Sequence, residues 1–241
     1  MQNAPVLTFV LLPGMDGTGE LFENLLTELP PEIKTIVVRY PTACILNYEE
    51  LITLADMQIP KNIPYVLLGE SFSGPIAIAL AARASEQLKA VILSCTFAIN
   101  PRPLLSKWSF LVPPMAINDK LLRIISKFLM SNFKDENVYK QLERVMPKVS
   151  PEILRARLDA VIGVNYLAEL AKINVPILYL KGKQDHLVPS SASKTILKFA
   201  KNVSLVELDA PHLLLQIAAK EAAEKIQIFL EKLELIKVRA D

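Results

Sequence analysis

Histidine and cysteine are both scarce in this chain of 241 residues, which has two of each. Because only His186 and His212 could offer imidazole ligands, a histidine-rich metal site is excluded. The two cysteines, Cys44 and Cys95, are too few for a disulfide framework, and neither has the spacing of a metal ligand. We therefore expect no disulfide framework and no metal, and nothing in the sequence implies a cofactor.

Long apolar runs are also missing, although 51% of the residues are hydrophobic. No run approaches the length of a membrane span. The first residues carry no basic segment, and the apolar run after them stops at Pro13-Gly14, so we interpret that run as a strand and not as a signal peptide. We expect a cytoplasmic protein without a membrane span. We expect no nucleic-acid partner either, although the net charge of +2 says little by itself.

Charge is unevenly distributed along the chain. Residues 100–172 hold twelve Lys/Arg and seven Asp/Glu, a net of +5. The remaining residues hold 27 − 12 = 15 basic and 25 − 7 = 18 acidic side chains, a net of −3. Two interpretations stay open: this basic block faces an acidic partner, or it is an ordinary solvated helical surface.

What the chain does contain is a serine between an apolar run and a buried helix. Residues 66–74 read Val-Leu-Leu-Gly-Glu-Ser-Phe-Ser-Gly, and an apolar helical segment follows at 75–82. Such a strand, sharp turn and helix lift the hydroxyl of Ser71 clear of the sheet, next to the first N–H groups of the helix. An acyl-transfer nucleophile belongs at that place, because the same turn supplies part of an oxyanion hole.

The order of the predicted elements indicates an α/β fold with a mostly parallel sheet of about six strands and helices on both faces. The predicted strands are residues 6–12, 35–40, 65–68, 89–94, 176–180 and 203–208. Predicted helices include 48–59, with Asn47 as its N-cap, and a closing helix at 213–235.

The alternation of strands and helices breaks between residues 97 and 172, where several prolines divide helical pieces. We interpret 97–172 as a helical lid inserted into a core made of 1–96 and 173–241. Ser150 and Pro151 open one of its helices. Its large apolar side chains belong to the lid core or line an acyl pocket: Trp108, Phe110, Met115, Phe128, Met130 and Phe133.

Polar residues follow several strands at the edge where sites form in open parallel sheets. Ser71, Asp185 and His212 come in the order that a catalytic triad has on such a sheet. His212 would take the proton of Ser71, and Asp185 would hold the imidazole. The N–H groups of Phe72 and Met15 would receive the oxyanion.

Other polar residues lie close to these positions in the sequence. Asp209 competes with Asp185 but is typical of a turn. Asp16 is expected to stabilise its own loop through an Asx-turn, and Glu70 is left without a role. The glycine-rich loop at 13–19 matches neither the dinucleotide fingerprint nor the phosphate loop.

Taken together, these motifs resemble those of the α/β-hydrolases. Residues 69–74 resemble the nucleophile elbow, 182–189 (Gly-Lys-Gln-Asp-His-Leu-Val-Pro) resemble the stretch with the acid, and 210–212 resemble the loop with the base. The chain departs from the family pattern in having Ser73 where the elbow normally has glycine, Pro13 before Gly14, and Pro211 before the base. The resemblance begins at the family's third strand, so no antiparallel leading hairpin is expected.

The resemblance implies a serine carboxylesterase that acts on a small or medium acyl ester. It extends to esterases that demethylate pimeloyl groups on acyl carrier protein, and a basic lid would suit such an acidic carrier. A thioesterase uses the same triad. An acyltransferase does so too, and residues 12–19 resemble the opening of the plastid phytyl-ester synthase group. An alternative of another class is a ligand-binding protein that has lost turnover. Ser71 excludes haloalkane and epoxide chemistry, which needs a carboxylate nucleophile.

Overall fold

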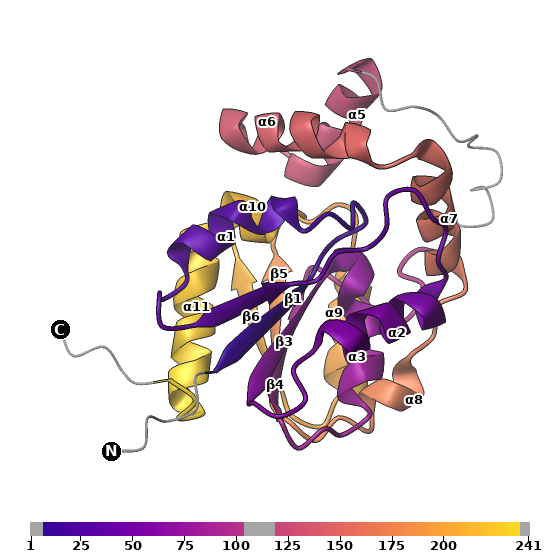
Figure 1. Cartoon of the computed structure of the whole chain (residues 1–241). Coiled ribbons are helices and arrows are strands. Elements are labelled where there is room, and N and C mark those ends of the chain that lie inside the picture. Colours follow the sequence, from indigo (N-terminus) through magenta and orange to yellow (C-terminus); the bar gives the residue numbers. More distant parts are fainter. Residues whose placement is uncertain (1–6, 104–118, 237–241) are drawn as a thin grey trace.

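A six-stranded parallel sheet forms the centre of the computed structural model, which describes residues 7–103 and 119–236 (Figure 1). The strand order is β2-β1-β3-β4-β5-β6, and every neighbouring pair is parallel. The strands are β1 (Thr8–Leu12), β2 (Lys34–Val37), β3 (Tyr65–Glu70), β4 (Leu88–Ser94), β5 (Ile177–Gly182) and β6 (Val203–Leu208). The predicted α/β-hydrolase architecture is confirmed.

Helices cover both faces of the sheet, as the buried central strands require. One face carries α1 (Glu23–Glu28), α10 (Leu214–Ile217) and α11 (Ala219–Lys232). The other carries α2 (Tyr48–Gln58), α3 (Gly74–Ala81), α8 (Leu167–Leu170) and α9 (Ser190–Phe199). Asn47 caps α2 as predicted, because its side chain accepts the N–H of Glu50 while the Glu50 carboxylate accepts the N–H of Asn47.

Residues 97–172, which we call the cap segment, lie between β4 and β5. Their described part holds α5 (Asp119–Met130), α6 (Glu136–Val145), α7 (Pro151–Ile162) and α8. Figure 1 shows α5 and α6 beyond the end of the sheet, above α10. Within the described ranges, the β pairing of this segment is one isolated bridge between Ile99 and Asn165. Trp108, Phe110 and Met115, predicted for the lid core or pocket, lie outside the described residues.

Two elements differ most from the sequence prediction, whereas other boundaries shift by one or two residues. The second strand ends at Val37 rather than Tyr40, because the Tyr40 N–H turns away to donate to the Gly17 carbonyl at 2.8 Å. The closing helix is not continuous but breaks at Ala218. There the side-chain amide of Asn24 donates to the carbonyl of Gln216 at 2.8 Å and takes the acceptor that a continuing helix would use.

Candidate functional site

Ser71 stands in a strained turn at the carboxyl end of β3. A 3₁₀ turn, Ser71–Ser73, joins β3 to α3, and Ser71 has a φ of 47°, which is unusual for a residue with a side chain. The hydroxyl of Thr96, at the end of the neighbouring strand, donates to the carbonyl of Ser71. The surrounding structure therefore holds the serine in the conformation that exposes its hydroxyl.

Glycines make this turn possible by letting the helix approach the strand. A Cβ atom at Gly69 would lie 2.7 Å from the Cβ of Ala77. One at Gly74 would lie 1.9 Å from Oγ1 of Thr96. Both positions exclude a side chain, which explains the glycines on either side of Ser71.

The structure brings Ser71, His212 and Asp185 together from three separate loops. Oγ of Ser71 lies 2.8 Å from Nε2 of His212, and Nδ1 of His212 lies 2.9 Å from Oδ2 of Asp185. The side chains of His212 and Asp185 are 6% and 3% exposed. This continuous chain of hydrogen bonds is the arrangement in which an imidazole can take a serine proton.

The carboxylate of Asp185 is held by its own loop. Its Oδ1 accepts the N–H groups of Leu187 and Val188, both at 2.9 Å. Burial by itself would raise the pKa of Asp185, but the charge of His212 and the hydrogen bonds from His212, Val188 and Leu187 outweigh burial and lower that pKa. Asp185 is thus kept ionised opposite the imidazole.

Asp209, the rival of Asp185, and His186, the other histidine of the chain, stand outside this chain of hydrogen bonds. Asp209 is exposed, and its Oδ1 accepts the side-chain amide of Gln184 at 3.0 Å. His186 is also exposed and borders a cavity beside the loop that carries Asp185.

The loop after β1 lies against the serine turn, because β1 and β3 are neighbours and Leu12 pairs with Gly69. Ser73, the departure from the family pattern, is fully buried, and its hydroxyl donates to the carbonyl of Pro13 while Oη of Tyr40 lies 2.7 Å away. Ser73 therefore ties the serine turn to the loop that carries Met15. The sequence identifies Ser73 only as a departure from the family pattern.

Asp16 forms the predicted Asx-turn within the same loop. Its Oδ2 accepts the backbone N–H of Thr18 at 2.8 Å and the Thr18 hydroxyl at 2.6 Å. A second turn is closed by the N–H of Gly17, which donates to the Gly14 carbonyl at 3.1 Å. Met15 thus lies inside a rigid turn, next to the turn that holds Phe72.

Glu70, left without a role by the sequence, is buried directly before Ser71. The pKa of Glu70 is raised to about 7, mainly by burial and to a smaller extent by the nearby Asp16 carboxylate. Hydrogen bonds from Gln216 and Gly14 and the charge of His212 oppose that rise. The amide of Gln216 donates to Oε1 of Glu70 at 2.9 Å and to the Leu21 carbonyl at 3.1 Å. Gln216 was missed, although one polar residue in the apolar run 213–217 is a detectable signal.

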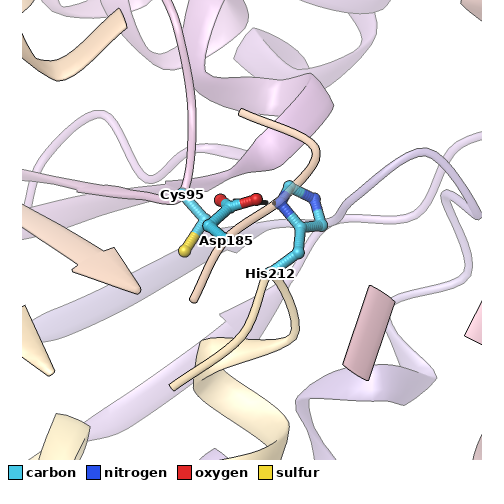
Figure 2. A group of neighbouring side chains, drawn as sticks. All are labelled: Cys95, Asp185 and His212. Carbon is cyan, nitrogen blue, oxygen red and sulfur yellow. Dashed lines mark hydrogen bonds and ion pairs between the residues drawn. The ribbon is translucent and has the colours of Figure 1, made fainter. Parts of the chain in front are cut away.

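Figure 2 shows Cys95 beside Asp185 and His212. One potential ligand atom of each lies within 4.8 Å of the others. However, Nδ1 of His212 is engaged with Asp185, and burial raises the pKa of the Cys95 thiol well above its ordinary value. A protonated thiol is a poor metal ligand, so the residues fit an acid–base pair better than a metal site.

The cap segment borders a cavity of about 850 Å³ next to His186. Of the side chains predicted to be core or pocket, Phe128, Met130 and Phe133 line it, together with Lys127 and Lys134. Among its described lining residues neither Ser71 nor His212 occurs, so the cavity lies beside the acid loop rather than over the serine.

Comparison with known proteins identifies the family of this chain. The α/β-hydrolase family described as "Serine aminopeptidase, S33" matches residues 37–209, well over half of the chain. The chain belongs to this family. The matched range includes Ser71 and Asp185 and ends three residues before His212.

Individual relatives are more distant. A pimeloyl-[acyl-carrier protein] methyl ester esterase of Vibrio campbellii is 27% identical over 199 residues, which cover 75% of this chain and 77% of that protein. Pyrrolizixenacetamide deacetylase of Xenorhabdus hominickii is 20% identical over 168 residues, 66% of this chain and 63% of the relative, so the chain spans less than two thirds of it.

Solved structures share the fold. A lipase-esterase related protein of Clostridium acetobutylicum ATCC 824 superposes with a TM-score of 0.79 at 19% identity, covering 93% of this chain and 95% of that one. The family match makes the chain a hydrolase of the α/β-hydrolase family, and esterases acting on ester bonds are among its relatives. None of the helices in the described ranges combines the length and the apolar character needed to cross a membrane.

Proposed function

We propose that the protein is a serine carboxylesterase with Ser71 as nucleophile, His212 as base and Asp185 as the acid that orients the base. The observation that carries this proposal is the unbroken hydrogen-bond chain from the Ser71 hydroxyl through both imidazole nitrogens to a buried carboxylate. A serine hydroxyl is a weak nucleophile at neutral pH, and this chain is what activates it.

In the proposed reaction, Oγ of Ser71 attacks the ester carbonyl carbon while Nε2 of His212 takes the hydroxyl proton. The N–H groups of Met15 and Phe72 receive the oxyanion of the tetrahedral intermediate. The intermediate collapses, the imidazolium returns its proton to the departing alcohol, and an acyl-enzyme remains. Water then attacks the acyl-enzyme by the same route in reverse and releases the carboxylic acid and free Ser71.

For the substrate, we propose a small or medium acyl ester, with an ester linked to an acidic acyl carrier protein as the specific candidate. Two observations support the carrier: relatives described as pimeloyl-[acyl-carrier protein] methyl ester esterases, and the basic excess of the cap segment. On α5, Lys120, Arg123 and Lys127 are exposed at helical spacing and form a basic surface near the site.

The first test compares wild type with Ser71→Ala on a short and a medium p-nitrophenyl ester. We expect wild type to hydrolyse at least one ester and the variant to lose at least ~10³-fold in kcat, since only oxyanion-hole and binding catalysis would remain. Release of p-nitrophenol, corrected for the uncatalysed rate, measures the activity of wild type and of the variant.

His212→Ala should lose activity to a similar degree as Ser71→Ala, because Ser71 and His212 act as one unit. Equal rates in wild type and Ser71→Ala would contradict the proposal, and a bound, unhydrolysed ester would then favour a ligand-binding protein. Matched thioesters, and an added alcohol as acyl acceptor, separate an esterase from a thioesterase or an acyltransferase with the same triad.

A further inference from the structure

Arg157, on α7 of the cap segment, has a buried guanidinium that reaches into the core. Only 3% of the residue is exposed. Its Nη1 donates to the carbonyls of Met15 at 2.7 Å and Asp16 at 2.8 Å, and its Nη2 donates to the carbonyl of Pro41 at 2.8 Å. A buried cation is costly unless its hydrogen bonds are well made, so these three carbonyls hold the guanidinium in one place.

The loop that Arg157 contacts is shaped to receive it. Gly17 has a φ of 72°, and a Cβ atom there would lie 2.5 Å from Nη1 of Arg157. Glycine is therefore required at this position both for the backbone conformation and for the approach of the guanidinium. The ring of Tyr40 forms another wall, with its centroid 5.8 Å from Cζ of Arg157.

Two of the three carbonyls belong to the proposed oxyanion loop. The Met15 and Asp16 carbonyls fix the two peptide planes that follow Met15. The N–H of Gly17, which shares a plane with the Asp16 carbonyl, donates to the Gly14 carbonyl at 3.1 Å. That carbonyl shares a plane with the Met15 N–H, a proposed oxyanion donor. Ser73 holds the same loop from the serine turn through the Pro13 carbonyl. The loop is thus anchored both by the core and by the cap segment.

The cap segment makes further hydrogen bonds to the loops of the triad. Nε of Arg102 donates to the carbonyl of Leu187 at 2.8 Å, and the hydroxyl of Ser131 donates to the carbonyl of Gln184 at 2.7 Å, on either side of Asp185. The N–H of Leu213, next to His212, donates to the Leu129 carbonyl at 3.1 Å. The cap segment therefore contacts the loops that carry Asp185 and His212 as well as the proposed oxyanion loop.

We infer that Arg157 is a positioning residue that holds the Met15 N–H where the oxyanion forms, so that a docked cap segment is required for turnover. An oxyanion donor stabilises a transition state only when it is oriented beforehand. A misplacement of about 1 Å in such a site costs on the order of 100-fold in rate. This inference rests on the proposed esterase function and assigns the cap segment a part in its chemistry.

The test uses Arg157→Met, which keeps the apolar stem and removes the donors, and Arg157→Lys, which keeps the charge. The control is Arg155→Met on the same helix, where Nε of Arg155 pairs with Asp159 at 2.7 Å. Rates on a p-nitrophenyl ester are divided by the number of active sites, counted by the endpoint of fluorophosphonate labelling. The affinity of a boronic acid, whose adduct with Ser71 is tetrahedral, is measured in parallel.

We expect Arg157→Met to lower kcat per active site by about 10- to 100-fold with KM changed by less than about twofold. Boronate affinity should fall by a similar factor, Arg157→Lys should recover part of both losses, and Arg155→Met should match wild type. If Arg157→Met does not fold, kcat per active site and boronate affinity are compared between Arg157→Lys and wild type instead.

An unchanged kcat per active site would overturn the inference, even if the variant melts at a lower temperature, because the role would then be structural. A lowered kcat with unchanged boronate affinity would overturn it too. If Ser71→Ala is inactive, either of these two results contradicts only the role of Arg157 and not the proposed esterase function. An active Ser71→Ala would contradict the esterase function itself.

Discussion

At the scale of the residue, Glu70 is a carboxyl group buried next to the proposed nucleophile, and its titration affects stability. Burial raises its pKa in the folded chain to about 7, from an ordinary value near 4.5. Between these two values the unfolded chain has lost the proton that the folded chain still holds. Stability from this group is therefore fully present below about pH 4.5 and is lost as the pH rises through about 7.

Glu70→Gln removes this titration while keeping the shape of the side chain. We expect wild type to lose on the order of 3 kcal/mol relative to the variant as the pH rises from about 4.5 to 7, and the difference to be constant above that. Urea unfolding of both proteins at several pH values measures the difference, from which all other titrations cancel. Parallel stability curves would show that Glu70 does not titrate in this range.

At the scale of the element, the strand, turn and helix around Ser71 depend on close packing between α3 and β4. Gly74→Ala would place a methyl group against Thr96, whose hydroxyl already holds the Ser71 carbonyl. We expect a loss of about 1 to 3 kcal/mol in the free energy of unfolding, together with reduced esterase activity.

Gly163→Ala is the matched control, because a Cβ atom there meets nothing within 4 Å and the residue has a φ of −89°. Its stability should stay within about 0.5 kcal/mol of wild type or rise slightly. Thermal unfolding followed by circular dichroism compares the two variants. Equal melting temperatures for them would mean that the turn relaxes around the new methyl group.

At the scale of the whole molecule, charge is divided between a basic cap segment and a slightly acidic remainder. Opposite charges speed association and fix orientation more than they add affinity. The proposed carrier would therefore approach from the side of α5, where Arg123 and Lys127 are exposed one helical turn apart.

The double variant Arg123→Glu, Lys127→Glu tests this directly. We expect kcat/KM on an ester linked to an acyl carrier protein to fall about 10-fold at low salt, with less difference at high salt, while p-nitrophenyl ester hydrolysis is unchanged. The control Lys220→Glu, Lys225→Glu makes the same change in net charge on α11, on a face of the sheet. An equal effect in both double variants would contradict a specific docking surface.

The sequence by itself determined the parallel sheet and the order of the candidate triad. Buried parallel strands appear as apolar runs, and their carboxyl ends meet at one edge, so residues far apart in sequence could be placed together before any coordinates. The cap of α2 was equally readable, because Asn47 and Glu50 interact within one helical turn.

Only the tertiary structure decided which side chains support that site. Ser73, Gln216 and Arg157 are buried with hydrogen bonds to segments as much as 195 residues away, and no local pattern encodes such pairs. The break at Ala218 has the same origin, since the Asn24 amide that interrupts the helix comes from α1. Local periodicity predicts elements, whereas the partners of buried polar groups depend on how those elements pack.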